Sequence, residues 1–519
     1  MDREEDQTVI RKSACPSWLF FGVYVCLLVV GLSAEGLADE IEFKNGAILN
    51  GTVTRQDSTT VSVSAGGIVE TYARADIRSV RIESEAPLPP TPLSVDRVEP
   101  DSTAGDAYGV LNPERAGFRV ADTDNGTLNI SVWSYVRYIN QLGLDDTYTD
   151  GSGVEKTVEK RRDIQYSKVS IQFKGWVLDE RLRYLAYVWA SPNVMGKATA
   201  FALVGNIEFR ITDHLVVGGG IQGLPTSRAM ELSHPRFNRV DVRSMGGEYF
   251  RGSYAAGVWL EGEPVEDLYF RTVLANSLSK LGVDAGQLDG KLATWSTGAW
   301  WSPKGGYAVA GMKSNGGGYG DFENHQSVAI RLGAHYTTSI ESAQSQPDVD
   351  DPENSQIRLS DGRLIFESPE VFNGAYLDEV RYQMVAMDAG LKYRGAALEG
   401  EVYFRHLDRF RFREGSDPGD LGFSRLIDTG WSIQPSYMVL REKLQVYVIG
   451  SVIYGDYGDP WDGVVGLNWF PVRANGLGRQ FRINGDAQYT SQSPIGNLSL
   501  PYTVGGRGWT YSVSAELFF

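Results

Sequence analysis

The last eleven residues of the chain, 509–519, alternate in character and end on an aromatic residue. One face of the strand predicted here is apolar and the other is small or polar; the first holds Tyr511, Val513, Ala515, Leu517 and Phe519, and the second Thr510, Ser512, Ser514 and Glu516. The closing strand of a lipid-embedded barrel needs this arrangement, because its outside faces lipid, its inside faces water, and closure removes the free edge. The segment therefore predicts such a strand, with Phe519 as an assembly signal. A C-terminal strand of a soluble β-sandwich remains the alternative.

The N-terminal segment is typical of an export signal. A basic pair at positions 11–12 precedes an apolar stretch over residues 18–32, and small residues follow that offer a cleavage site. The stretch is shorter than the ~20 residues of a membrane-spanning helix. We expect residues 1–38 to be a signal peptide. Because Cys15 and Cys26 both lie inside it, the mature protein would contain no disulfide.

Composition favours an all-β chain and argues against nucleic acid as a partner. The formal net charge is -16, and the chain contains 59 glycines, 26 tyrosines and 12 tryptophans. Binding to phosphate backbones would need a basic face, which an acidic balance disfavours. The mean hydropathy of -0.24 is compatible with a membrane barrel, because half of each strand faces water.

Composition divides the rest of the chain into three regions. Residues 39–84 show short alternating segments separated by turn signals, and they resemble a small SH3-like or Sm-like β domain. Residues 85–116 are rich in Pro, Asp and Ser and predict an extended linker. Residues 117–519 repeat the alternating pattern to the end, which predicts an outer-membrane β-barrel domain.

The third region divides into sixteen predicted antiparallel strands, an even number as in bacterial transmembrane barrels. We expect them at 127–139, 163–176, 181–190, 201–211, 214–223, 252–262, 267–276, 292–302, 326–338, 379–394, 396–407, 429–440, 443–455, 462–472, 480–490 and 509–519. Short turns alternate with long polar loops, the pattern of periplasmic turns and external loops. The connection around 303–325 is too long for a turn, so either it is elaborated or the barrel has eighteen strands.

Charged residues fall on the polar face of these strands. A Lys or Arg facing lipid at mid-depth costs about 2–4 kcal/mol, so such residues are expected to line a water-filled lumen. By phase, the inward basic residues are Lys168, Lys174, Arg271, Arg331, Lys392, Arg394, Arg405 and Arg482. The third long loop adds the constriction candidates Arg228, Arg236 and Arg239. These residues either give the pore a preference for anions or pair with inward carboxylates and stiffen the wall; the carboxylates are Glu399, Glu401, Asp486 and Glu516.

Five short segments, taken in order, resemble the phosphate-selective porin O and P family of outer-membrane channels. They are Gly117–Leu128, Lys160–Arg162, Gly218–Pro225, Trp300–Pro303 and Val465–Pro471. The resemblance implies a trimeric, sixteen-stranded porin whose third loop folds into the lumen, with basic residues on that loop and the facing wall attracting anions. The module at 39–84 departs from the family, whose members often carry a short tail or a coiled coil there.

The remaining motifs point to no chemistry. Gly218–Gly223 matches G-x-G-x-x-G, but no helix follows it, so it predicts no nucleotide site. The acidic segments 145–146 and 347–353 lack the ligand spacing of a calcium loop and are expected to be solvated. The five histidines show no metal-ligand spacing, and His335, which faces inward by phase, is a poor candidate for a catalytic residue at the lipid edge. We expect no cofactor, no metal and no catalysis.

Together these patterns predict a porin of the bacterial outer membrane, with its N-terminal module in the periplasm. It would let small hydrophilic solutes diffuse passively, with anions such as phosphate as candidate solutes. The expected partners are outer-membrane lipid, further copies of the chain in a homotrimer, and the barrel assembly machinery acting on the strand that ends at Phe519. The alternatives are an outer-membrane barrel enzyme and an exported soluble protein that binds polysaccharide.

Overall fold

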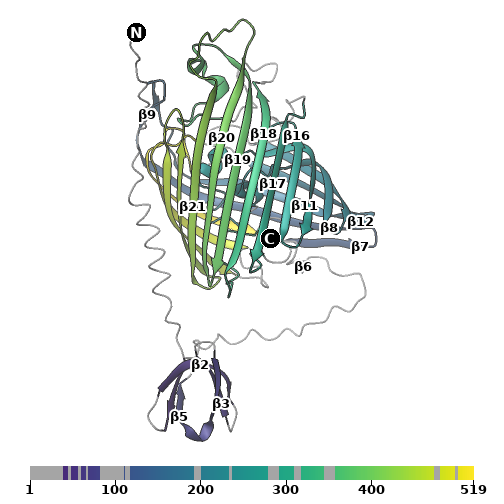
Figure 1. Ribbon diagram of the computed structural model, residues 1–519, viewed down its shortest axis with the longest axis vertical. Coiled ribbons are helices and arrows are strands. Elements are labelled where there is room, and N and C mark those ends of the chain that lie inside the picture. Colours follow the sequence, from purple (N-terminus) through teal and green to yellow (C-terminus); the bar gives the residue numbers. More distant parts are fainter. Residues whose placement is uncertain are drawn as a thin grey trace, which may run out of the picture. The chain divides into compact units, whose positions relative to one another are not determined.

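Sixteen antiparallel strands close into one barrel in the computed structural model (Figure 1). The structure describes residues 39–44, 48–56, 60–65, 68–81, 110–111, 117–191, 200–232, 236–278, 291–308, 317–343, 357–472, 480–496 and 501–519. The predicted signal peptide and nearly all of the predicted linker lie outside these residues.

The barrel consists of β8 and of β11 to β25, each paired with its neighbours in chain order. Their bounds are β8 (Gly126–Leu144), β11 (Arg162–Val177), β12 (Asp179–Ser191), β13 (Ala200–Thr212), β14 (Leu215–Gly223), β15 (Tyr254–Val265), β16 (Leu268–Ala275), β17 (Thr294–Lys304), β18 (Ala329–Ser342), β19 (Leu377–Tyr393), β20 (Ala396–Phe412), β21 (Arg425–Leu440), β22 (Leu444–Tyr454), β23 (Trp461–Val472), β24 (Phe481–Thr490) and β25 (Gly508–Phe518). Every predicted strand overlaps the observed strand in the same position. The prediction of sixteen strands is confirmed.

The barrel closes where its last strand pairs with its first. β25 pairs with β8 from Gly508 opposite Leu144 to Phe518 opposite Trp133. The backbones of Phe519 and Val132 then exchange two hydrogen bonds, of 2.8 and 3.0 Å. Beyond this point β7 (Phe118–Thr123) pairs with the start of β8, and β6 (Val110–Leu111) pairs with β7. The predicted closing strand is therefore present.

The two faces of the strands differ in polarity as the alternation predicts. On β25, the outward Tyr511 and Val513 are 50% and 52% exposed, whereas the inward Ser514 and Glu516 are buried. Outward aromatic rings form a row across β23, β24 and β25, with neighbouring ring centroids 5.3 to 6.3 Å apart; the row contains Trp461, Tyr489, Trp509 and Tyr511. An apolar, aromatic exterior is what a barrel embedded in lipid requires. None of the helices in the described part of the chain is long and apolar enough to cross a membrane.

Connections of different length lie at the two ends of the barrel. One end, called the turn end here, has short connections such as Leu178 between β11 and β12 and residues 394–395 between β19 and β20. The opposite end is the loop end. Turn residues take left-handed backbone conformations, with φ of +66° at Leu178 and +47° at Arg394. These conformations let the chain reverse within one to three residues.

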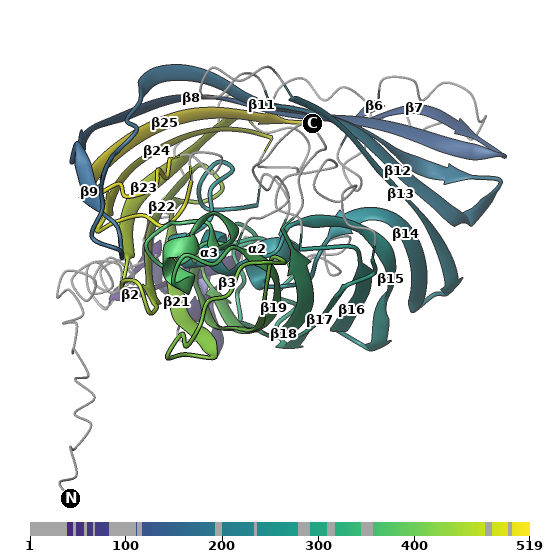
Figure 2. The ribbon, with the colours of Figure 1, turned by 90° about the horizontal axis from the view of Figure 1, so that it is seen from above.

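Two long connections fold into the barrel. Residues 224–253, the constriction loop, run from β14 to β15 and contain α2 (Arg228–Glu231) and α3 (Met245–Phe250), which lie within the ring of strands in Figure 2. Residues 305–308 and 317–328, called the β17–β18 segment here, are the described part of the connection between β17 and β18, and they enter from the turn end. The predicted long connection around 303–325 is therefore an elaborated turn and not a missed strand.

An apolar core fills the lumen toward the loop end. Tyr249 and Phe250 of α3 pack with inward residues of β19 and β20, and the ring of Phe250 stacks on Tyr403 at 4.9 Å. The loop-end connection after β18, described from residue 357, adds η3 (Ile365–Glu367) and η4 (Pro369–Phe372) to this core. The hairpin of β9 (Thr147–Thr149) and β10 (Glu155–Thr157) lies in the connection between β8 and β11.

The N-terminal module forms a compact unit of its own, and its described residues lie between 39 and 81. It is a five-stranded antiparallel sheet in the order β4-β3-β2-β1-β5, with bounds β1 (Asp39–Phe43), β2 (Ile48–Gln56), β3 (Thr60–Ala65), β4 (Ile68–Ala73), η1 (Arg74–Asp76) and β5 (Ile77–Arg81). Ile41 and Val61 are fully buried in it. The turn signals of this region, Asn45-Gly46 and Gly66-Gly67, lie outside the described residues.

Candidate pore and its constriction

The constriction loop crosses the lumen and is attached to most of the barrel wall. Its residues contact β8, β11 and β18 to β24. At β22, the backbone amide of Gly246 donates to Ser451 Oγ at 2.6 Å, and at β19 Tyr382 Oη donates to the Phe250 carbonyl at 2.7 Å. Ser244 caps α3 by accepting from the Gly247 amide at 3.1 Å. A loop attached at so many points is a fixed part of the lumen.

Toward β24 and β25, buried ion pairs hold the middle of the loop. Arg239 Nη2 lies 2.8 Å from Asp486 Oδ1, and Arg482 Nε on β24 lies 2.6 Å from Glu516 Oε2 on β25. Arg482 also donates to the carbonyls of Phe237 and Arg239, at 2.6 and 3.1 Å. Because these guanidinium groups are already bound to carboxylates and backbone, they are not free to bind a solute.

A second buried cluster joins the start of the loop to β18, β19 and β20. The Arg228 amide donates to Glu401 Oε1 at 2.7 Å, and Arg228 Nε lies 3.8 Å from Glu399 Oε2. Arg331 pairs with both Glu231 and Asp388. Oppositely charged groups must be paired when they lose water, which accounts for this density of contacts.

The predicted Lys168, Arg271, Lys392 and Arg405 are also inward and paired. Lys168 Nζ lies 2.6 Å from Asp241 on the constriction loop, and Arg271 Nε lies 2.5 Å from Glu261 on β15. Lys392 Nζ lies 3.3 Å from Glu323, and Arg405 Nη2 lies 2.7 Å from Asp428. These contacts favour the second interpretation drawn from the sequence, in which basic residues pair with carboxylates and stiffen the wall.

Two further predicted basic residues are Arg394 and Arg236, and the prediction that Arg394 lines the pore is wrong. Arg394 does not face the lumen, because it lies in the β19–β20 turn, where positive φ interrupts the strand alternation, and its guanidinium covers the ring of Tyr393. Arg236 is half-buried in the constriction loop, and its carbonyl accepts from the Tyr319 amide at 3.0 Å.

The wall formed by β11 to β16 is different, because its inward charges toward the turn end are only half-buried. By strand register, Arg183 on β12 lies opposite Glu208 on β13, and Arg210 is two residues further along β13. Neither arginine forms an ion pair or a hydrogen bond within the described part of the chain, whereas nearby Arg271 is paired. Lys174 on β11 faces the same side. Arg183 and Arg210 on this wall can therefore meet a solute.

Three inward arginines were not predicted from the sequence, namely Arg137, Arg183 and Arg210. Arg137 on β8 is buried and donates to Ser514 Oγ at 3.2 Å and to the Val240 carbonyl. The alternation of β8, β12 and β13 places Arg137, Arg183 and Arg210 inward just as it places Lys168. Applying the same phase rule to every strand would have found them.

His335 is inward as predicted, and its surroundings do not suit catalysis. Its Nδ1 lies 3.0 Å from the Pro225 carbonyl and its Nε2 lies 3.0 Å from Asp388 Oδ2. Both ring nitrogens therefore face oxygen acceptors, and neither is placed to activate a hydroxyl nucleophile. The residue joins the constriction loop to the wall.

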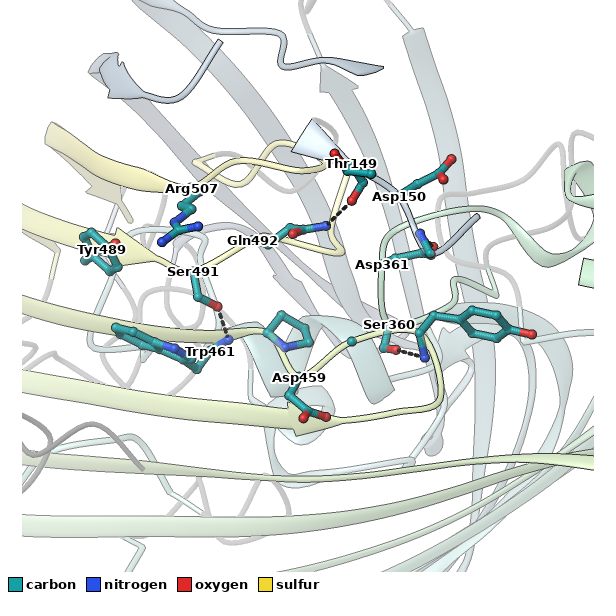
Figure 3. Close-up of a pocket in the computed structure, with 14 residues that line it drawn as sticks. Thr149, Asp150, Ser360, Asp361, Asp459, Trp461, Tyr489, Ser491, Gln492 and Arg507 are labelled. Atoms are coloured by element: carbon teal, nitrogen blue, oxygen red, sulfur yellow. Dashed lines mark hydrogen bonds between the residues drawn. The ribbon is translucent and has the colours of Figure 1, made fainter. Parts of the chain in front are cut away.

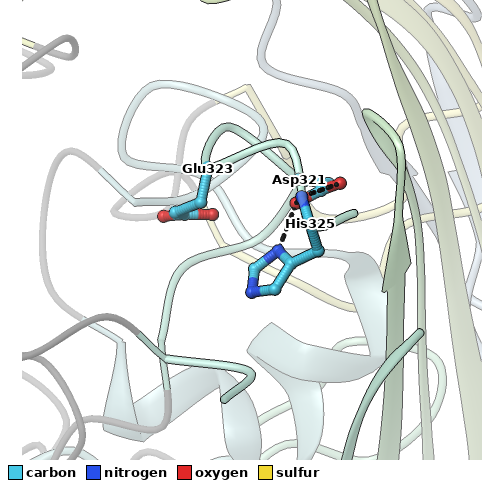
Figure 4. Close-up of side chains that lie close together, drawn as sticks. All are labelled: Asp321, Glu323 and His325. Carbon is cyan, nitrogen blue, oxygen red and sulfur yellow. Dashed lines mark hydrogen bonds and ion pairs between the residues drawn. The ribbon is translucent and has the colours of Figure 1, made fainter. Parts of the chain in front are cut away.

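Asp321, Glu323 and His325 in the β17–β18 segment bring three potential metal-ligand atoms together (Figure 4). The contacts argue against a cation. Both nitrogens of His325 face oxygen atoms, Nδ1 at 2.5 Å from Asp321 Oδ1 and Nε2 at 3.2 Å from the Gly306 carbonyl, so both are engaged in hydrogen bonds and neither is directed at a shared cation position. Glu323 is engaged by Lys392. The trio is a structural cap of the segment.

A cavity of about 390 Å³ lies among the loop-end connections (Figure 3). Two of its carboxylates are occupied: Asp150 pairs with Lys156 at 3.0 Å, and Asp361 accepts from Arg363 Nε at 2.6 Å. Trp461 also lines it, although this residue belongs to the outward aromatic row. The cavity thus belongs to the rim of the barrel, and the candidate site is the lumen.

No protein-family model matches the chain, and no curated protein matches its sequence. Several solved structures are similar in fold. The outer-membrane-expressed OmpT of Vibrio cholerae is 9% identical with a TM-score of 0.46, and 77% of this chain and 99% of that chain are covered. An anion-selective porin from Comamonas acidovorans is 10% identical with a TM-score of 0.46, covering 76% and 100%. The outer membrane channel DcaP of Acinetobacter baumannii is 9% identical with a TM-score of 0.44, covering 78% and 100%. The conclusion that this chain forms a closed barrel is drawn from its own strand pairing.

Proposed function

We propose that this protein is a porin of the bacterial outer membrane, which lets small hydrophilic solutes diffuse passively through its lumen. The observation that carries this proposal is the closed sixteen-stranded barrel, apolar outside and polar inside, whose interior is narrowed by an inward-folded loop. Sixteen strands enclose more space than their own side chains fill, so the lumen can hold water. The resemblance to the phosphate-selective porin O and P family agrees with this architecture.

The proposed path follows the β11–β16 wall, and its proposed preference is for anions such as phosphate. Arg183 and Arg210 supply positive charge there, because the buried basic residues described above, such as Arg239, Arg331 and Arg482, are already bound to carboxylates. Glu208 and Glu261 on the same wall reduce the net charge, so we expect a moderate preference. Charged groups lining a constriction set the selectivity of a pore.

The test is single-channel recording of detergent-purified protein in planar bilayers, with the reversal potential measured under a salt gradient. We expect long-lived conductance steps with an anion preference. In the Arg183→Ala/Arg210→Ala variant the reversal potential should shift toward cations. Arg441→Ala is the matched control, because Arg441 lies in the β21–β22 turn with a side chain 70% exposed and paired to Glu442. A cation preference of the unmodified protein would remove the phosphate proposal and keep the porin.

The proposal also concerns the location of the protein, its assembly and its oligomeric state. In this proposal the module at 39–84 is in the periplasm, and the assembly machinery inserts the barrel through the strand ending at Phe519. Fractionation tests the location: recovery in the soluble fraction without detergent would support the polysaccharide-binding alternative. Chemical crosslinking of the purified protein tests the homotrimer, whose absence would give monomers only.

A further inference from the structure

The β17–β18 segment lies at the turn end, where the other connections described in full are one to three residues long, yet it folds into the lumen. Tyr307 and Asp321 are fully buried, and Tyr319 is 4% exposed. A solvated surface turn would not bury an aromatic ring and a carboxylate in this way. These residues are therefore part of the packed interior of the barrel.

Three residues of the barrel wall hold the side chain of Tyr307 in one position. Its hydroxyl donates to Glu399 on β20, and the ammonium of Lys392 on β19 lies 4.5 Å from the centre of its ring. Gly390 leaves the space that the Tyr307 hydroxyl occupies, since a Cβ there would collide with it. Cation–π contact and a charge-assisted hydrogen bond together favour one docked position.

Residues 321–322 of the segment contact the β19–β20 turn and β23. Asp321 accepts from the Gly395 amide at 2.7 Å in the β19–β20 turn. Phe322 packs against Phe470 of β23, with ring centroids 5.1 Å apart. Contacts from β19 through β23 show that the segment spans the part of the turn-end opening beneath these strands.

The segment also meets the constriction loop inside the lumen. Arg228 Nη2 donates to the Gly317 carbonyl at 2.8 Å, and the ring of Phe237 lies edge-on to that of Tyr319 at 6.1 Å. Two connections that enter from opposite ends therefore form one continuous obstruction. On the wall of β11 to β16, the inward charged side chains toward the turn end are half-buried and not covered by this obstruction.

We propose that the β17–β18 segment is a second constriction element, which narrows the turn-end opening and sets the size limit for solutes together with the constriction loop. This inference rests on the proposed channel function. Tyr307 and Tyr319 are its positioning residues: Tyr307 fixes the segment to the wall and Tyr319 fixes it to the loop. Solutes that pass are those small enough for the space beside the β11–β16 wall.

The experiment compares unmodified protein with Tyr307→Ala/Tyr319→Ala and with Gly390→Ala, which displaces the Tyr307 hydroxyl while keeping both anchors. Tyr393→Ala is the control, because Tyr393 follows Lys392 on β19 and is directed outward. Folding is checked by heat-modifiable migration. Single-channel conductance and the swelling of proteoliposomes in neutral sugars of increasing length are then measured. We expect higher conductance and entry of longer sugars in both lumen variants but not in the control.

The outcomes separate this inference from the channel function. Conductance in the folded lumen variants alone, with none in the unmodified protein, would support the second constriction. If unmodified and folded variant proteins conduct equally and admit the same sugars, the inference is wrong and the porin stands. If neither conducts, both are overturned. Because Gly390→Ala adds one methyl group to a strand, it keeps the test decisive if the double variant fails to fold.

Discussion

Buried ion pairs are the residue-scale feature that decides whether the lumen attracts ions or is simply rigid. Arg482 and Glu516 sit on neighbouring strands and are each at most 1% exposed. Trp133 Nε1 also donates to Glu516, at 2.8 Å. Removing one of the two charges leaves the other buried without a partner, where little water can solvate it. Such a change lowers the free energy of unfolding.

We therefore predict that Arg482→Met strongly destabilises the barrel, by about 3–5 kcal/mol, the range for an orphaned buried charge. The double variant Arg482→Met/Glu516→Gln should recover a large part of this loss, because no uncompensated charge remains. Urea unfolding of the protein in lipid vesicles, followed by tryptophan fluorescence, measures both. Equal destabilisation of the single and double variants would contradict the role of the charge.

Gly430 shows how a missing side chain shapes the lumen. A Cβ at this position would lie 2.5 Å from Phe250 Cε2, so the glycine makes room for the ring of α3. We predict that Gly430→Ala costs about 1–3 kcal/mol through overpacking. Gly485→Ala is the matched control, because a Cβ there meets nothing within 4 Å. The same unfolding assay should show a loss of stability for Gly430→Ala alone; equal losses at both positions would exclude overpacking as the cause.

At the scale of elements, the β17–β18 segment contains a titratable cap outside the strands. The hydrogen bond from His325 to Asp321 raises the pKa of the imidazole above its ordinary value of 6.5. The charged groups near His325 are Asp321, Glu323 and Lys392. Because the folded pKa is raised, the protonated ring stabilises the segment fully below the ordinary pKa, and this stabilisation is lost as the pH rises through the folded pKa.

We predict that the docked segment loosens as the pH rises from the ordinary imidazole pKa of 6.5 through the raised pKa of His325. Protection of its backbone amides in hydrogen exchange should fall over this range, after correction for the intrinsic pH dependence of exchange. The His325→Gln variant, which cannot titrate, should show no such pH-dependent loss of protection. A pH dependence that persists in the variant would assign the effect to another group.

At the scale of the whole molecule, closure depends on the end of the chain. Phe519 forms the last two backbone hydrogen bonds between the closing strand and β8, and its ring meets Phe118 of β7 at 5.4 Å. An unclosed barrel would leave unpaired backbone groups in lipid, each costing several kcal/mol.

We predict that deletion of Phe519 lowers the yield of folded barrel in the membrane fraction, whereas Phe519→Tyr largely preserves it because the backbone bonds and the ring remain. Heat-modifiable migration after expression measures the folded fraction. Normal folding of the deletion variant would show that closure through β25 tolerates a missing terminal residue.

Much of the barrel follows from local patterning. Alternation of apolar and polar residues specifies a strand, its two faces and its neighbours in a meander, because side chains on a strand alternate strictly and successive strands pair. For this reason the sixteen strands, the lipid-facing side of β25 and the inward side of residues such as Lys168 and Arg482 were predictable. Arg394 was not, because a turn breaks the alternation on which the phase rule depends.

The sequence by itself determined the all-β class, the position of each strand and the closing strand, while it left sixteen and eighteen strands as alternatives. Only the tertiary structure decided which charges are paired and which wall keeps half-buried charges. The partners of Arg228, Arg239 and Arg331 come from segments far apart in the chain, so their meeting depends on how two connections fold inside a closed barrel. Local periodicity carries no information about such encounters, because a long connection has no repeating pattern that fixes its path.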